Sequence, residues 1–158
     1  MDNRPTWHEY FMQMAYLAAK RSTCLRRAVG AALVRDNQLI STGYNGSPKN
    51  SPHCAEVGCL REQQNVPSGQ KHELCRGVHA EQNAIIQAAI NGSSTRNSVL
   101  YCTHQPCSIC ARLIINAEIR EVYIANAYPD DLAEQLFREA GIGMYHINLQ
   151  NQAVTRLI

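Results

Sequence analysis

The chain has 158 residues, of which 45% are hydrophobic and 18% charged, and its formal net charge is +2. A chain of this length fits one domain and buries about 70% of its unfolded surface, so its core needs no disulfide bonds. No apolar run approaches the roughly 20 residues of a membrane span, and the polar start of the chain is unlike a signal peptide. We therefore expect a single domain over residues 1–158 that is cytoplasmic and has no membrane partner.

Seven cysteines are the unusual feature of the composition. An odd number of thiols without an export signal favours metal binding or redox chemistry over a disulfide framework. The 15 basic and 13 acidic residues form no long basic run. Charge therefore gives no reason to expect a stable nucleic-acid partner.

The first half of the chain contains one clear helix and one clear hairpin. A capping box followed by apolar residues at helical spacing predicts a helix from Thr6 to about Lys20. Two apolar runs, residues 28–35 and 38–44, are joined by Asp36-Asn37 and predict a β-hairpin. Residues 45–78 show no steady period and predict a long loop, which in a small domain is usually functional or held by a ligand.

Helices and strands alternate in the second half. A nearly continuous apolar helix is predicted over residues 79–90, buried on more than one side. The changes of period that follow predict strands over residues 99–103, 121–126 and 142–147 and helices over residues 107–117 and 130–140. Such alternation favours right-handed crossovers between parallel strands. The expected fold class is α/β, a three-layer α/β/α sandwich with a mixed five-stranded sheet.

Two predicted helices begin with residues that bind metals. His79 opens one, and Cys107 and Cys110 open the other, three positions apart and on one helix face. The positive end of a helix dipole favours thiolates there. One imidazole and two thiolates leave the fourth position of a tetrahedral zinc ion open, as in catalytic sites. The alternative is a structural zinc clip, but such a site is normally closed by a fourth protein ligand.

Glu81 follows the histidine by two residues, too close to bind the same ion easily. We expect it to take a proton from the zinc-activated water and to pass it to a ring nitrogen and then to leaving ammonia. His-x-Glu followed by Pro-Cys-x-x-Cys is the signature of zinc nucleobase deaminases. The zinc motif therefore predicts hydrolytic deamination, with Glu81 as the proton shuttle.

Beyond this motif, the chain resembles deoxycytidylate (dCMP) deaminases of the cytidine-deaminase superfamily, in the bacterial and phage branch, from Trp7 to about Ile147. The zinc motif alone is shared with cytidine, tRNA-adenosine, guanine and riboflavin-pathway deaminases. The segment Gly43-Tyr44-Asn45-Gly46 and the cysteine-rich loop narrow the resemblance to the dCMP branch. The further motifs that carry it are Glu9-Tyr10-Phe11-Met12, Arg21-Ser22-Thr23-Cys24 and Val29-Gly30-Ala31.

The resemblance implies conversion of dCMP to dUMP and ammonia, supplying dUMP for thymidylate synthesis, with zinc hydroxide attacking C4 of the cytosine ring. It implies that Asn45 holds the deoxyribose hydroxyl and that Tyr128 lines the nucleotide pocket. The alternatives are a turn role for Asn45, because Asn-Gly favours turns, and a lid over the core for Tyr128. Ala80, between the two motif residues, is also assigned to the substrate-binding set.

The 5′-phosphate of the substrate needs hydrogen-bond donors, for which Arg26 and Arg27 are the candidates. Arginines on a surface loop are most often solvated, which is the alternative for both. Family members are typically hexamers and are often regulated by dCTP and dTTP. The resemblance therefore implies a homo-oligomer, hexameric by analogy, with these nucleotides as possible effectors.

Four further cysteines predict a second, structural zinc. Cys102 lies within an apolar strand, where a buried thiol is ordinary. Cys24, Cys54, Cys59 and Cys75 remain, and three of them fall in the long loop, where family members have a metal-bound loop with variable ligands. Two histidines are competing ligands, and free buried thiols are the alternative to a metal. The competing histidines are His53 and His72, and the arginines close enough in sequence to offset thiolate charge are Arg26, Arg27, Arg61 and Arg76.

Sequence features distinguish dCMP deamination from three other possible functions. A tRNA-adenosine deaminase needs a basic face, whereas the basic residues here are scattered. Free-cytidine deaminases usually have a cysteine in the place of His79. A zinc-stabilised nucleic-acid-binding scaffold without activity would not need Glu81.

Overall fold

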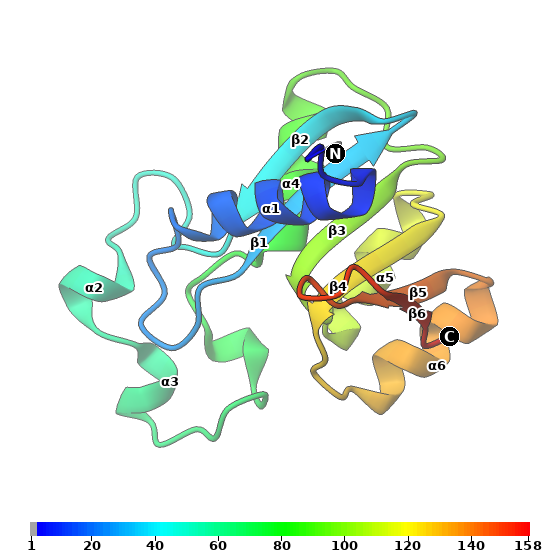
Figure 1. Ribbon diagram of the computed structural model, residues 1–158. Helices are drawn as coiled ribbons and strands as arrows, with labels where there is room; N and C mark the ends of the chain where they lie inside the picture. Colours follow the sequence, from blue (N-terminus) through cyan, green and yellow to red (C-terminus); the bar gives the residue numbers. More distant parts are fainter. Residues whose placement is uncertain (1–2) are drawn as a thin grey trace.

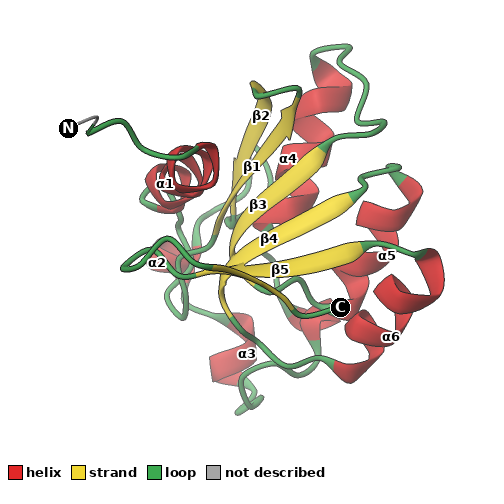
Figure 2. Cartoon of the chain, turned by 45° about the vertical axis from the view of Figure 1, so that its right-hand side comes forward, coloured by secondary structure: helices red, strands yellow, loops and turns green. Residues whose placement is uncertain are grey.

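The computed structural model describes residues 3–158, which form one mixed sheet covered by helices on both faces. Helix α1 (Trp7–Ala19) lies on one face, and α4 (Ala80–Ile90), α5 (Ser108–Asn116) and α6 (Asp131–Ala140) lie on the other (Figures 1 and 2). The predicted α/β class and three-layer arrangement are confirmed. Within the described residues, no helix has the length and apolar character to cross a membrane.

The sheet has the strand order β2-β1-β3-β4-β5-β6. The first strands, β1 (Gly30–Arg35), β2 (Gln38–Tyr44) and β3 (Val99–His104), pair antiparallel, whereas β3 pairs in parallel with β4 (Glu121–Asn126), and β4 with β5 (Gly143–Ile147). The parallel arrangement predicted for the second half is therefore confirmed. Each helix of that half connects two neighbouring parallel strands or leads into one.

The sheet has six strands, one more than the five expected. A sixth strand, β6 (Val154–Arg156), pairs antiparallel with β5, with Tyr145 opposite Arg156. Three residues are too few to show a period of two, so the sequence carries no signal for this strand. The strand forms because the backbone N–H and C=O groups at the edge of β5 can pair with the chain that follows it.

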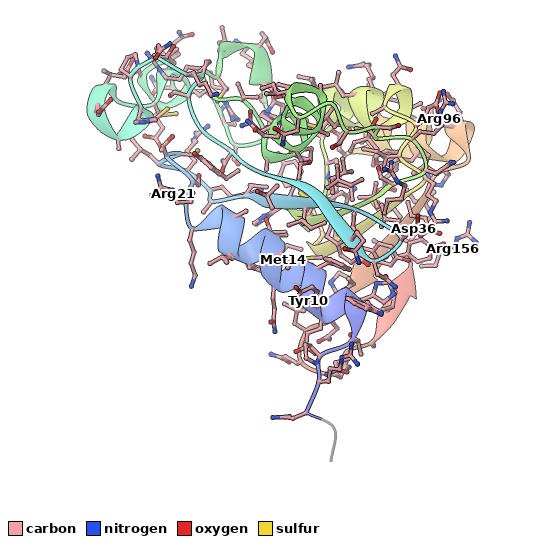
Figure 3. The ribbon with its side chains drawn as sticks, turned by 90° about the horizontal axis from the view of Figure 1, so that it is seen from above. Tyr10, Met14, Arg21, Asp36, Arg96 and Arg156 are labelled. Atoms are coloured by element: carbon pink, nitrogen blue, oxygen red, sulfur yellow. The ribbon has the colours of Figure 1, made fainter. Side chains whose placement is uncertain are left out.

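Local signals account for the first elements. The Thr6 side chain accepts a hydrogen bond from the Glu9 backbone N–H (3.2 Å), which starts α1 as predicted. Asp36 and Asn37 have φ values of 51° and 57°, the left-handed conformation that a two-residue hairpin turn requires. Figure 3 shows Asp36 at the hairpin tip and Arg21, just after α1, at opposite ends of the β1–β2 pair.

The long loop contains three short helices that the sequence analysis did not predict. These are α2 (Cys54–Val57), α3 (Leu60–Gln63) and the 3₁₀ helix η1 (His72–Leu74). Four residues make only about one turn, so no apolar face repeats and no period is visible. In Figure 1 the loop lies beyond the carboxyl ends of β3 and β4, the end of a sheet where α/β proteins usually bind ligands.

Helix α4 packs directly on the β1–β2 pair because Gly43 has no side chain. A Cβ atom at Gly43 would lie 2.1 Å from the Ala80 carbonyl oxygen and 2.5 Å from the Ala84 nitrogen. The opposite side of the helix is open, since Ile86 is 44% and Ile90 63% exposed. The helix also contacts α5. The predicted burial on more than one side therefore holds for the sides facing the sheet and α5, whereas the outer side with Ile86 and Ile90 is exposed.

The close approach at Gly43 is testable. Gly43→Ala would push the first turn of α4 away from β2, and overpacking of this kind costs about 1–3 kcal/mol. We expect a lower midpoint of urea unfolding and less zinc retained per chain, because His79 begins this helix. The comparison variant is Gly92→Ala, whose new Cβ meets no atom within 4 Å but whose φ of +69° strains an alanine. It should lower the midpoint without loss of zinc, so zinc retention separates crowding at α4 from general destabilisation. A Gly43→Ala protein with the wild-type midpoint would contradict the close packing.

Candidate active site

Three potential metal ligands converge where two helices begin. His79 is the N-cap of α4 and Cys107 the N-cap of α5, and Cys110 lies in the first turn of α5. His79 Nδ1 lies 3.6 Å from Cys107 Sγ and 3.3 Å from Cys110 Sγ. With Zn–S bonds of about 2.3 Å and Zn–N bonds of about 2.0–2.1 Å, tetrahedral nitrogen and sulfur ligands are about 3.5 Å apart. The three residues therefore fit one zinc ion.

Backbone contacts fix this geometry. Gly46 and Val78 exchange two hydrogen bonds (3.1 and 2.8 Å), which holds the residue before His79 against the end of β2. The His79 N–H donates to Gln82 Oε1 (2.7 Å) in a capping interaction. On the other helix, the Ser108 N–H donates to Asp130 Oδ2 (2.9 Å). Each ligand therefore sits on a helix start that is itself anchored.

The pKa shifts of the two cysteine ligands are consistent with binding of a cation. Hydrogen bonds from Cys110 and His79 lower the pKa of Cys107 to about 4. The pKa of Cys110 is raised, because its thiol donates to the Cys107 thiolate and because it is buried. The hydrogen bond between them therefore makes Cys107 the more acidic of the two thiols. A divalent cation between the three ligands favours the thiolate form of both cysteines.

The Glu81 side chain is next to this cluster and only 5% exposed. Burial is the main cause that raises the pKa of its carboxyl group, and a hydrogen bond with the Cys110 side chain opposes the rise. Cys102 is fully buried in β3, as expected, and lies close enough to Glu81 for the carboxylate to raise the pKa of its thiol. The site therefore holds a carboxyl group shielded from bulk water.

The cluster opens into a cavity of about 150 Å³. His79, Glu81 and Cys107 contribute to its wall from the helix starts, and the long loop contributes from the other side. The remaining predicted substrate-binding residues also line it, namely Asn45, Ala80, Tyr128, Arg26 and Arg27. The structure thus brings all the residues of that predicted set to one cavity.

The Asn45 side chain is largely occupied by bonds within the chain. Its Oδ1 accepts from the Val29 N–H (2.9 Å) and the Ser22 hydroxyl (2.5 Å), and its Nδ2 donates to the Arg27 carbonyl (2.7 Å). No tight turn forms here, since Gly46 continues extended to its bridge with Val78. Asn45 therefore ties the segment before β1 to the end of β2.

The two candidate arginines differ. Arg26 Nη2 donates to the Val66 carbonyl (2.8 Å), and its Nε forms an ion pair with Glu62 (3.6 Å). Arg27 is exposed, and its guanidinium carbon lies 4.9 Å from the centre of the Tyr128 ring. Arg26 therefore fixes the loop, whereas the Arg27 guanidinium lies beside the cavity without such a bond to the loop.

The four remaining thiols come into one region of the described chain. Burial raises the pKa of the Cys54 thiol, and Cys24, Cys59 and Cys75 are near enough to raise it further, while Arg76 opposes the rise. Among residues 3–158, however, only His79, Cys107 and Cys110 place three ligand atoms within 4.8 Å of one another. Of the competing histidines, His53 is exposed and is the N-cap of the helix that begins with Cys54, and the ring of His72 is 5.3 Å from that of His79.

Two positioning residues were missed by the sequence analysis. Asp130 caps α6 through the Ala133 N–H (3.0 Å) and also holds the start of α5. Gln105 accepts from the Tyr128 N–H (3.2 Å) and donates to Glu134 (3.2 Å). A signal for each was present in the sequence: Asp130 is the first residue of the helix predicted over residues 130–140, and Gln105 is a polar residue between a predicted strand and Pro106.

Comparison with known proteins gives consistent results. Residues 5–126 match the profile of the cytidine and deoxycytidylate deaminase zinc-binding region. The chain is 40% identical to ComE operon protein 2 of Bacillus subtilis over 96% of this chain and 76% of that protein. It is 41% identical to the deoxycytidylate deaminase of Schizosaccharomyces pombe over 88% of this chain, but spans only 43% of that protein.

A viral relative and a solved structure extend the similarity to nearly complete chains. The deoxycytidylate deaminase of Enterobacteria phage T4 is 29% identical over 89% of both chains. The crystal structure of dCMP deaminase from the cyanophage S-TIM5 in complex with dCMP and dUMP has a TM-score of 0.76 at 28% identity, covering 91% of this chain and 98% of that one. With the helix starts and buried glutamate described above, these matches show that the chain belongs to the cytidine and deoxycytidylate deaminase family.

Proposed function

We propose that this protein catalyses the hydrolytic deamination of dCMP to dUMP and ammonia. The observation that carries the proposal is the cluster of His79, Cys107 and Cys110 beside the buried carboxyl group of Glu81, at one cavity. The choice of substrate is supported by relatives named deoxycytidylate deaminase and by the similar phage structure in complex with dCMP and dUMP. The protein is thus a hydrolase that acts on a pyrimidine nucleotide.

Zinc is the metal that suits these ligands. When bound by one imidazole and two thiolates, it acts as a Lewis acid and lowers the pKa of water in the open fourth position towards neutrality. The described residues provide three closely spaced ligand atoms and no fourth within the same group, which is the pattern of a catalytic site. His79 Nδ1 is the ring nitrogen that faces the sulfur atoms.

Glu81 moves the protons of the reaction. Burial raises the pKa of its carboxyl group, so Glu81 holds a proton more readily than an exposed glutamate does, which suits a group that accepts and then returns a proton. It accepts a proton from the attacking water and delivers it to a nitrogen of the cytosine ring as the new C–O bond forms at C4. Glu81 then accepts the proton of the new C4 hydroxyl group and delivers it to the amino nitrogen, so that the C–N bond breaks, the C4 carbonyl forms and ammonia is released.

The remaining cavity residues hold the nucleotide. The Ala80 N–H lies in the first turn of α4, where backbone donors have no partner within the helix and can bind a base oxygen. Asn45 places the segment that carries Arg27, and one of its amide hydrogens is free for a sugar hydroxyl. Tyr128 lines the cavity beside the sugar, and Arg27 binds the 5′-phosphate.

Glu81→Gln tests the mechanism. The amide has the same shape but cannot accept the proton, so we expect turnover of dCMP to fall by roughly 100- to 10,000-fold. Zinc content and melting temperature should stay near the wild-type values. The control is Glu118→Gln, since Glu118 is exposed and pairs only with Arg96 at the surface. Wild-type turnover by the Glu81→Gln protein would refute the mechanism.

Arg27→Ala tests the phosphate assignment. Loss of a charge-assisted hydrogen bond costs about 1.5–3 kcal/mol, so KM for dCMP should rise roughly 10- to 150-fold. KM for deoxycytidine, which has no phosphate, should not change. Assays of the wild-type protein on dCMP, CMP, dCTP and a tRNA stem-loop in the same series test the nucleotide class. An equal effect of Arg27→Ala on dCMP and deoxycytidine would remove Arg27 from the phosphate site.

We also propose that Cys24, Cys54, Cys59 and Cys75 hold a second, structural zinc. Support comes from the pKa of Cys54, which is raised by burial and further by the nearby Cys24, Cys59 and Cys75. The described thiols must draw closer together to share an ion. The hexameric assembly and the dCTP and dTTP effectors stay predictions from the family resemblance.

Metal analysis tests the second site. We expect about two zinc ions per wild-type chain and about one in Cys54→Ser, because a site that lacks one of four ligands binds zinc far more weakly. Cys102→Ala, which removes a buried thiol outside both sets, should keep two. One zinc per wild-type chain after gentle purification would contradict the proposal.

A further inference from the structure

Ser68 and Gly69, in the segment 66–71 between α3 and η1, line the cavity. Two arginines hold the start of this segment through its carbonyl groups. Arg26 donates to Val66 (2.8 Å), and the buried Arg61 donates to Pro67 (3.3 Å). The segment is therefore fixed at its base, and the position of Gly69, two residues further on, follows from these bonds.

Gly69 lies directly against the tyrosine that follows β4. A Cβ atom at this position would lie 1.9 Å from the Tyr128 hydroxyl oxygen and 3.1 Å from Cζ of the same ring. The φ angle of Gly69 is +79°, which side chains rarely adopt. Both the close contact and the backbone conformation therefore require glycine at position 69. The atom that a side chain there would meet first is the Tyr128 hydroxyl oxygen.

The same ring is held from two further directions. The Tyr128 backbone N–H donates to Gln105 Oε1 (3.2 Å), which anchors the residue next to the zinc motif. The Arg27 guanidinium carbon lies 4.9 Å from the ring centre, within the range of a cation–π interaction. The Tyr128 ring thus connects the backbone of the cavity wall to the Arg27 side chain.

We propose that Gly69 is a positioning residue that sets the preference for a nucleotide over a nucleoside. Because it has no side chain, Tyr128 can rest against the segment, and the ring in turn places the Arg27 guanidinium at the phosphate. The inference rests on the proposed function, in which Arg27 binds the phosphate. A methyl group at position 69 would displace the ring and its arginine without touching His79 or Glu81.

Gly69→Ala tests this chain of contacts. We expect KM for dCMP to rise about tenfold or more, as for a lost charged hydrogen bond, with kcat nearly unchanged. KM for deoxycytidine should not change. In a Tyr128→Phe background the same substitution should have a much smaller effect, because the nearest side-chain atom is then Cζ at 3.1 Å.

Gly92→Ala is the matched control, because its φ is +69° and no atom lies within 4 Å of the new Cβ. It adds the same kind of backbone strain and should leave KM unchanged. An equally large rise in KM when Gly69→Ala is made in the Tyr128→Phe background would show that strain, not the tyrosine, causes the effect. An equal rise for dCMP and deoxycytidine would show that the effect does not pass through Arg27. Either result overturns the inference.

Melting temperatures separate this inference from the proposed function. The wild type, both single variants and the double variant form a cycle that measures the Gly69–Tyr128 coupling without any substrate. Independent effects of the two substitutions would reject the contact even if the protein deaminates dCMP. If the wild-type protein does not deaminate dCMP, the proposed function is wrong, and so is the role of Gly69 in phosphate binding. The melting temperatures still show whether Gly69 and Tyr128 are coupled.

Discussion

The site depends on the meeting of two helix N-termini beyond the same end of the sheet. His79 and Cys107 are 28 positions apart in the chain, yet each caps a helix whose first turn faces the other. The first turn of α4 is set by the bare backbone of Gly43, and that of α5 by Asp130. Because the ligands belong to anchored helix starts, the metal geometry follows from the packing of the layers.

The acid–base properties of the site follow from the burial of Glu81, Cys107 and Cys110 at the two helix starts. A hydrogen bond joins the buried Cys107 and Cys110 thiols, and a cation between them would favour both thiolates. Burial also raises the pKa of the Glu81 carboxyl group, because it removes the charged form from water. A carboxyl group in open solvent would stay ionised and be a poor proton donor near pH 7. In the proposed mechanism, burial therefore suits Glu81 to accept and then return a proton.

The long loop serves the site although it has little regular structure. Its order comes from single contacts: the Gly46–Val78 bridge and the arginine bonds to the carbonyls of Val66 and Pro67. These contacts place Gly69 against Tyr128 and bring four thiols into one region. The loop is thus a wall of the cavity, built by side chains that reach across to backbone.

The sequence alone determined the features that depend on neighbours within a few positions. The capped first helix, the hairpin at Asp36-Asn37, the alternation of the second half and the spacing of the zinc motif are all of this kind. Only the tertiary structure decided that β6 joins the sheet, that Arg26 is tied to the loop while Arg27 is not, and that Gly69 rests on Tyr128. The reason is physical: these contacts join backbone and side chains far apart in the chain, and no local period records which distant atoms will meet.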